Sequence, residues 1–248
     1  MRGARLLAQL LSEGVTGAET AAGGMERDSG AGESADRGAD WRHPVVFGIF
    51  ILCLLPEILL SGADWGLWGN HAWRRWAIEY GGFWSGLLSD WRPNYPLQRW
   101  SMFVSYGFLH GGAVHFAVNM MTLFSLGPPL ADHFGGWRLA AIYAASIVGG
   151  AAGFALLSGL SQPMVGASGA LFGLAGALVA LSWRDLRARH APLTPVIRAV
   201  LGLTGLNLVL WWAMNGQLAW ETHLGGFVTG AIAALLFDPA PHPDGDPG

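Results

Sequence analysis

Lysine is absent from the sequence, and charged residues of any kind are scarce. Only 12% of the 248 residues are Asp, Glu, Lys or Arg, whereas an average soluble domain carries roughly 25%. The net charge of -3 and the pI of about 6.2 exclude the basic surface that nucleic acid binding requires. The single cysteine, Cys53, excludes a disulfide within the chain. These shortages argue against a soluble domain.

Apolar residues are abundant where charged ones are scarce. They account for 52% of the chain, and the mean hydropathy is +0.37. Several apolar runs approach or reach the roughly 17 to 25 residues that a membrane-spanning helix needs. They predict six helices, at 44–60, 101–126, 138–158, 168–183, 195–213 and 221–237. The sequence therefore predicts an all-α, polytopic membrane protein whose six-helix domain covers residues 44–238.

Three other segments have distinct compositions. Residues 1–43 are rich in small and charged residues, which predicts a disordered tail. Residues 239–248 form a short C-terminal tail. The first loop, 61–100, holds seven of the 13 tryptophans. Because indole rings favour the headgroup level of a bilayer, this loop either lies in the membrane interface or folds into a cap that packs its own tryptophans.

The arginines indicate the orientation. If the N-terminus is cytoplasmic, the outer side holds only four of the 14 arginines, all in the first loop. The opposite arrangement would place the basic loop between the fourth and fifth helices outside. The positive-inside rule therefore predicts a cytoplasmic N-terminus.

A few polar residues interrupt the apolar runs. Because ionisable groups inside a bilayer are costly, they are candidates for function. His110, His115 and Asn119 lie in the expected second helix, Ser168 begins the fourth, and His223 begins the sixth. These three helices run in the same direction, from outside to inside. The five residues should therefore share one depth near the outer ends of their helices.

The length of the fourth helix suggests how deep that level is. From Ser168 to Trp183 it has 16 residues, or about 24 Å, which is short of the roughly 30 Å hydrocarbon core. We therefore expect Ser168 to lie beneath the outer surface, in a hydrated cavity surrounded by protein.

Small residues predict which helices touch. Gly169 and Gly173 in the fourth helix, and Gly226 and Gly230 in the sixth, are spaced as in pairs that let helix backbones approach closely. If these two faces meet, the hydroxyl of Ser168 and the imidazole of His223 (three residues before Gly226) come within hydrogen-bonding range.

A serine next to a histidine suggests nucleophilic chemistry, because the hydroxyl is a weak nucleophile until a base takes its proton. No acidic residue is obviously placed to orient His223, so the pattern favours a Ser168–His223 dyad. The free N–H groups at the start of the helix of Ser168, together with His115 and Asn119, would stabilise negative charge on a substrate oxygen.

These residues resemble the motifs of the rhomboid family of intramembrane serine proteases. Gly166-Ala-Ser168-Gly169 is similar to the family's GxSG motif. His110, His115 and Asn119 match its second-helix pattern, and His223, Gly226 and Gly230 match its sixth-helix pattern. The resemblance implies Ser168 as nucleophile, His223 as general base, His115 and Asn119 as oxyanion donors, and supporting roles for His110 and Gly166. It also implies cleavage of transmembrane protein substrates near the outer membrane face, without a metal or other cofactor.

The sequence departs from the family pattern at two positions. Phe172 stands where many members have a tyrosine that stacks on the catalytic histidine, and its ring should still stack on His223. The usual first-loop Trp-Arg pair is out of place, because Trp91-Arg92 lies too far upstream of His110. The six helices resemble the minimal bacterial form, which implies a bacterial inner membrane.

Three other functions compete with this interpretation. A zinc protease would use the histidines as ligands, but no HExxH motif occurs, and His110 and His115 are five residues apart. An inert rhomboid-like protein would bind membrane clients without cleaving them, although such relatives lack the serine or the histidine. A small transporter would need polar groups near the bilayer centre and repeat symmetry, and no convincing repeat is present.

Overall fold

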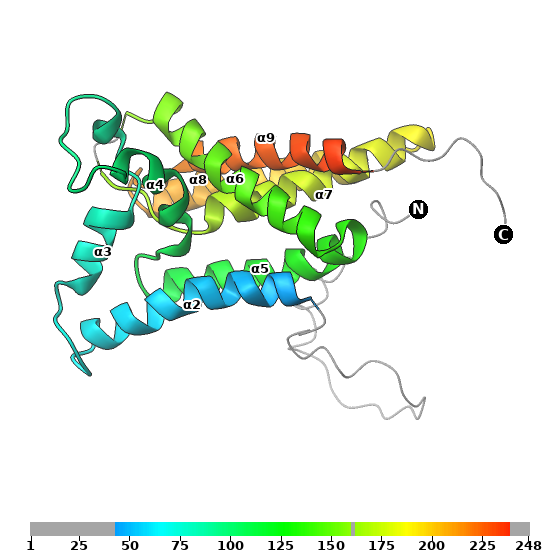
Figure 1. The fold of residues 1–248 in the computed structure, drawn as a ribbon. Helices are drawn as coiled ribbons and strands as arrows, with labels where there is room; N and C mark the ends of the chain where they lie inside the picture. Colours follow the sequence, from blue (N-terminus) through cyan, green and yellow to red (C-terminus); the bar gives the residue numbers. More distant parts are fainter. Residues whose placement is uncertain (1–42, 160–161, 239–248) are drawn as a thin grey trace, which may run out of the picture.

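The computed structural model describes residues 43–159 and 162–238 (Figure 1). The tails predicted at 1–43 and 239–248 lie outside this range, except for His43. Over the described residues the regular structure is helical, apart from one isolated bridge between Phe83 and Met164. The predicted all-α fold is confirmed.

Six long helices form the bundle in the part of the chain that the structure describes, and shorter helices connect the first two of them. The long helices are α2 (Pro44–Asp64), α5 (Ala113–Phe134), α6 (Gly136–Leu157), α7 (Ser168–Ala188), α8 (Thr194–Ala213) and α9 (Trp220–Phe237). The short ones are α3 (Trp73–Gly81), η1 (Ser85–Leu88), α4 (Gln98–Ser105) and η2 (Tyr106–Phe108).

The hydropathy of the long helices fits a multi-pass membrane protein. By length and composition, α2, α6, α7 and α8 are each able to cross a membrane. The other two, α5 and α9, carry polar residues such as Asn119 and His223 among their apolar ones. The chain is therefore an integral membrane protein whose candidate site residues lie on or beside its long apolar helices.

The helices differ in how firmly they are packed. α7 is the most buried of the four helices able to cross a membrane, with 72% of its apolar segment buried, and it packs against α6 and α9, which also pack directly against each other. α2 and α5 lie side by side on the other side of the bundle (Figure 1). By contrast, only 6% of the corresponding segment of α8 is buried.

Glycines bring α7 and α9 together as predicted. A methyl group added at Gly226 would overlap the carbonyl oxygen of Gly169, and one added at Gly230 would overlap that of Gly173. Backbone therefore touches backbone along this interface, and the predicted contact between the two faces is confirmed.

The helix predicted at 101–126 is wrong. The chain forms α4 and η2, leaves the helical conformation at 109–112, and starts α5 at Ala113. Gly112 adopts φ +143°, a conformation that side chains disfavour, and this breaks an apolar run that looks continuous. His110 therefore lies in a loop. At the other end, Pro128 and Pro129 do not end α5, which continues to Phe134.

The fourth helix is longer than predicted. α7 has 21 residues, or about 31 Å, because Arg184, Asp185 and Arg187 continue the helix beyond the apolar run. The apolar run ends at Trp183, but the helix does not. Helix length alone therefore does not place Ser168 beneath the membrane surface, and its depth stays a prediction.

The first loop is folded but does not bury its tryptophans. It contains α3, η1 and the first three residues of α4. Two hydrogen bonds between Phe83 and Met164, both 2.9 Å, tie it to the loop that precedes Ser168. Trp84 packs against Trp91, with 5.7 Å between ring centroids. Five of the seven tryptophans are nevertheless more than 40% exposed: Trp65, Trp68, Trp76, Trp91 and Trp100.

Candidate functional site

Ser168 is the first residue of α7, directly after a constrained loop. Gly166 has φ +129°, and its N–H donates to the carbonyl oxygen of Tyr106 at 3.0 Å. A side chain at Gly166 would be strained and would also collide with the ring of His115. The glycine thus lets His115 approach the helix start, where the N–H groups of the first turn have no partner within the helix.

His223 lies in the first turn of α9 and faces Ser168. Its Nε2 is 3.0 Å from the Ser168 Oγ, so the contact predicted between these side chains is confirmed. His223 is buried, whereas Ser168 is half-buried. The ring of Phe172 stacks on the imidazole at 4.2 Å between centroids and 9° between planes. The predicted stacking is therefore also confirmed.

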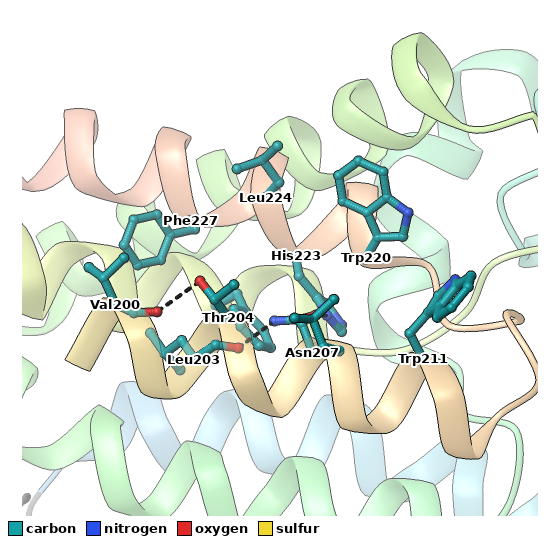
Figure 2. A pocket seen from close by; sticks show the side chains of 11 residues that line it. Val200, Leu203, Thr204, Asn207, Trp211, Trp220, His223, Leu224 and Phe227 are labelled. Atoms are coloured by element: carbon teal, nitrogen blue, oxygen red, sulfur yellow. Dashed lines mark hydrogen bonds between the residues drawn. The ribbon is translucent and has the colours of Figure 1, made fainter. Parts of the chain in front are cut away.

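Asn207 on α8 is a contact of His223 that sequence reasoning missed. Its Oδ1 is 2.6 Å from His223 Nδ1, and its Nδ2 donates to the carbonyl oxygen of Leu203 at 3.0 Å. Figure 2 shows the two side chains reaching toward each other from α8 and α9. They border a cavity of about 550 Å³ between these helices, lined mostly by apolar side chains. The sequence signal that could have indicated Asn207 is a polar residue in an apolar run.

His115 and Asn119 lie one turn apart on α5. The N–H of Gly111 donates to His115 Nδ1 at 3.3 Å, which places the ring proton on Nε2. That Nε2 edge faces Gly166. The Nδ2 of Asn119 donates to the carbonyl oxygen of His115 at 2.7 Å, and a second N–H of the same amide is left for another acceptor. The structure brings His115 to the loop that precedes Ser168.

His110 is buried behind this group. Only 1% of its surface is exposed, and its ring lies 5.3 Å from that of His115 and 5.4 Å from that of Phe116. Burial lowers the pKa of His110 to about 3, so the ring is neutral. It packs against His115, and no hydrogen bond joins it to Ser168 among the described residues.

An arginine that sequence reasoning also missed holds the loop of His110. Arg74 on α3 donates from Nη1 to the carbonyl oxygen of His110 at 2.7 Å. The same guanidinium pairs with Glu57 at 2.9 Å and with Asp64 at 2.5 Å, both on α2. The side chains of Arg74 and Glu57 are 12% and 5% exposed. This buried cluster connects α2, the first loop and the segment that leads into α5.

The histidines do not form a metal-binding group. Within residues 43–159 and 162–238, no three His, Cys, Asp or Glu side chains are grouped in a way that could hold a metal ion. The ring nitrogens of His115 and His223 instead make hydrogen bonds to a backbone N–H, a hydroxyl and an amide. The residues present fit acid–base chemistry better than zinc ligation.

The fold and the site together define a class: a multi-pass helical membrane protein in which a serine and a histidine meet at one end of two closely packed helices. Comparison with known families identifies it further. The rhomboid domain profile matches residues 97–239, more than half of the chain. The chain belongs to the rhomboid family.

Individual relatives agree with this assignment. The chain is 33% identical to RHOMBOID-like protein 5 of Arabidopsis thaliana over 143 residues, which are 56% of this chain and 44% of that protein. It is 31% identical to Rhomboid-type serine protease 2 of Emericella nidulans, covering 58% and 28%. It is 35% identical to Rhomboid protease GluP of Bacillus subtilis, covering 51% and 24%. The chain thus spans less than half the length of these curated relatives.

Proposed function

We propose that this protein is an intramembrane serine endopeptidase with Ser168 as nucleophile and His223 as general base. The observation that carries the proposal is the 3.0 Å contact between Ser168 Oγ and His223 Nε2. A contact of this length is what proton transfer from the hydroxyl requires. Relatives whose names include serine protease or protease support the same activity.

The reaction follows from these two side chains. Ser168 Oγ attacks the carbonyl carbon of the scissile peptide bond while its proton passes to His223 Nε2. The imidazolium then gives that proton to the leaving amine, and the C–N bond breaks. A water molecule, deprotonated by the same nitrogen, then attacks the acyl-enzyme ester; the C–Oγ bond breaks, the imidazolium returns the proton to Ser168 Oγ, and the second product leaves. Each proton that the histidine takes up is therefore returned.

Three groups of donors are candidates to stabilise the negative charge of the tetrahedral intermediate. Ser168 begins α7, so the first backbone N–H groups and the positive end of the helix dipole lie beside it. His115 offers Nε2–H from the side of Gly166, and Asn119 offers its second amide N–H. We assign these donors to the oxyanion, as in acyl-transfer sites generally.

The substrates we propose are segments of membrane proteins, cleaved near the outer membrane end with the N-terminus of the enzyme in the cytoplasm. A bond inside a regular helix has its carbonyl oxygen hydrogen-bonded and its backbone wrapped. Substrates with helix-destabilising residues at the cleavage point should therefore be cut faster than strongly helical ones.

Reconstitution in liposomes with a generic single-span substrate tests the proposal. Wild-type protein should cleave it, and a fluorophosphonate probe should label Ser168. Ser168→Ala and His223→Ala should both reduce cleavage to background while keeping the thermal unfolding temperature. A metal chelator should leave cleavage unchanged. Substrate binding without cleavage by the wild type would instead identify an inert client-binding protein, and chelator-sensitive cleavage would identify a metalloprotease.

A further inference from the structure

Asn207 determines which nitrogen of His223 carries the proton. The amide of Asn207 has one oxygen and one nitrogen, and its nitrogen is committed as the donor to the carbonyl oxygen of Leu203 at 3.0 Å. The atom that faces His223 Nδ1 at 2.6 Å is therefore the oxygen, which only accepts. The hydrogen in this bond must come from the imidazole, so Nδ1 is protonated.

The other imidazole nitrogen is then fixed as well. In a neutral ring with Nδ1–H, Nε2 holds a lone pair and acts as an acceptor. Ser168 Oγ lies 3.0 Å from that lone pair. The hydrogen bonds thus run in one direction, from the Ser168 hydroxyl through the imidazole and the Asn207 amide to the carbonyl oxygen of Leu203. This is the direction in which a base must be aligned to take the serine proton.

We propose that Asn207 is a positioning residue for the proposed protease reaction: its Oδ1 holds His223 in the tautomer that accepts the Ser168 proton. This inference rests on the proposed function. It extends the Ser168–His223 pair to a Ser–His–Asn arrangement, in which the third member is a neutral amide. When His223 takes the serine proton, Nδ1–H stays in place and its bond to Oδ1 becomes charge-assisted, which makes it stronger.

The third member comes from the least anchored of the long helices. Of the 20 residues of α8, only Val196 and Ala199, near its start, are buried. Within the described part of the chain, the bond between Asn207 and His223 is the only hydrogen bond that joins α8 to another helix. The other side-chain bonds of α8, those of Thr204 and Asn207 to backbone oxygens, stay within the helix. The bond to His223 exists only while α8 keeps Asn207 within hydrogen-bonding distance of α9, so the histidine is oriented for reaction in that arrangement of the helices.

Thr204 offers a matched control, since it lies one turn before Asn207 and lines the same cavity. Its hydroxyl donates to the carbonyl oxygen of Val200 on its own helix, and it makes no bond to His223. Thr204→Val changes the polarity of α8 at almost constant shape. Asn207→Leu removes the acceptor at nearly constant volume, and Asn207→Asp restores an acceptor while losing the donor to Leu203.

Steady-state cleavage and the rate of fluorophosphonate labelling at Ser168 should be measured for these variants. Asn207→Leu should lower kcat and the labelling rate about 10- to 100-fold with KM within about twofold, which is the scale of losing one hydrogen bond to a charged group. Asn207→Asp should recover most of the lost kcat, and Thr204→Val should match the wild type. The inference is overturned if Asn207→Leu retains kcat within twofold, if Thr204→Val loses as much, or if Asn207→Asp gives no recovery.

A second measurement does not depend on turnover. The 15N shifts of labelled imidazoles distinguish a protonated from an unprotonated ring nitrogen, and His223→Ala identifies the resonances of His223. The wild type should show Nδ1–H with an unprotonated Nε2, and Asn207→Leu should show a mixture of tautomers. The same tautomer in both would overturn the inference. A wild type that neither cleaves nor labels would refute the protease proposal, while this measurement would still decide the role of Asn207.

Discussion

Gly226→Ala tests whether backbone contact between α7 and α9 sets the Ser168–His223 distance. By intrinsic helix propensity alone, replacing glycine with alanine stabilises the helix by about 1 kcal/mol. The added methyl, however, would overlap the carbonyl oxygen of Gly169, and a backbone carbonyl cannot rotate away as a side chain can. Ordinary carbon contacts are about 3.5 Å or longer, so the two helices must separate by more than about 1 Å. Overpacking of this kind costs about 1 to 3 kcal/mol, and a rigid neighbour favours the upper value.

The expected net loss is therefore about 2 kcal/mol in the free energy of unfolding, which still leaves a protein of ordinary stability folded. The same separation stretches the 3.0 Å contact between Ser168 and His223 beyond hydrogen-bonding range, so labelling of Ser168 should fall much further than stability does. Denaturant unfolding in detergent and the fluorophosphonate labelling rate measure the two effects. Gly202→Ala on α8 is the control, because a methyl there meets nothing within 4 Å. Wild-type labelling by Gly226→Ala would refute the reasoning.

Three further predictions concern the surrounding groups. Arg74→Met should lower the free energy of unfolding by about 3 to 5 kcal/mol, because it leaves the buried carboxylate of Glu57 without its cationic partner. Adding Glu57→Gln should restore most of the lost stability. Simple additivity of the two changes in a double-mutant unfolding cycle would contradict this prediction. Asn119→Ala should reduce kcat about 100-fold at constant KM, which is the usual effect of removing one oxyanion donor. An unchanged kcat would show that Asn119 only bonds to the backbone of His115 and does not stabilise the oxyanion. Phe172→Leu should lower kcat by about 2- to 12-fold, because ring stacking contributes about 0.5 to 1.5 kcal/mol. Phe172→Tyr keeps the ring and should keep the wild-type kcat. Equal rates in the two variants would show that the stacked ring is dispensable.

The parts of the site that sequence could predict depend on short-range spacing. Gly169 and Gly173 must be four apart to line one helix face, and the same holds for Gly226 and Gly230. Their contact therefore follows from helix geometry. The approach of Ser168 to His223 follows in turn, because each lies within three residues of a glycine in that interface.

The parts that sequence could not predict depend on long-range contacts or on a local break. Asn207 stands out in the sequence only as a polar residue in an apolar run, and that run does not indicate which helix its amide oxygen meets. Arg74 and the carbonyl oxygen of His110 are 36 residues apart and meet only in the fold. The break at 109–112 has apolar and small residues on both sides, and hydropathy carries no signal for a backbone angle such as that of Gly112.

These differences imply that the three helices of the site control different properties of the histidine. The backbone contacts of α7 and α9 fix how far His223 lies from Ser168, and they leave little freedom because glycine faces glycine. α8 fixes the proton position on the same ring through one hydrogen bond, and it is hardly buried. Changes at the glycine interface should therefore lower activity and stability together. Changes at Asn207 should lower activity while stability stays near that of the wild type, because so little of the folded structure depends on α8.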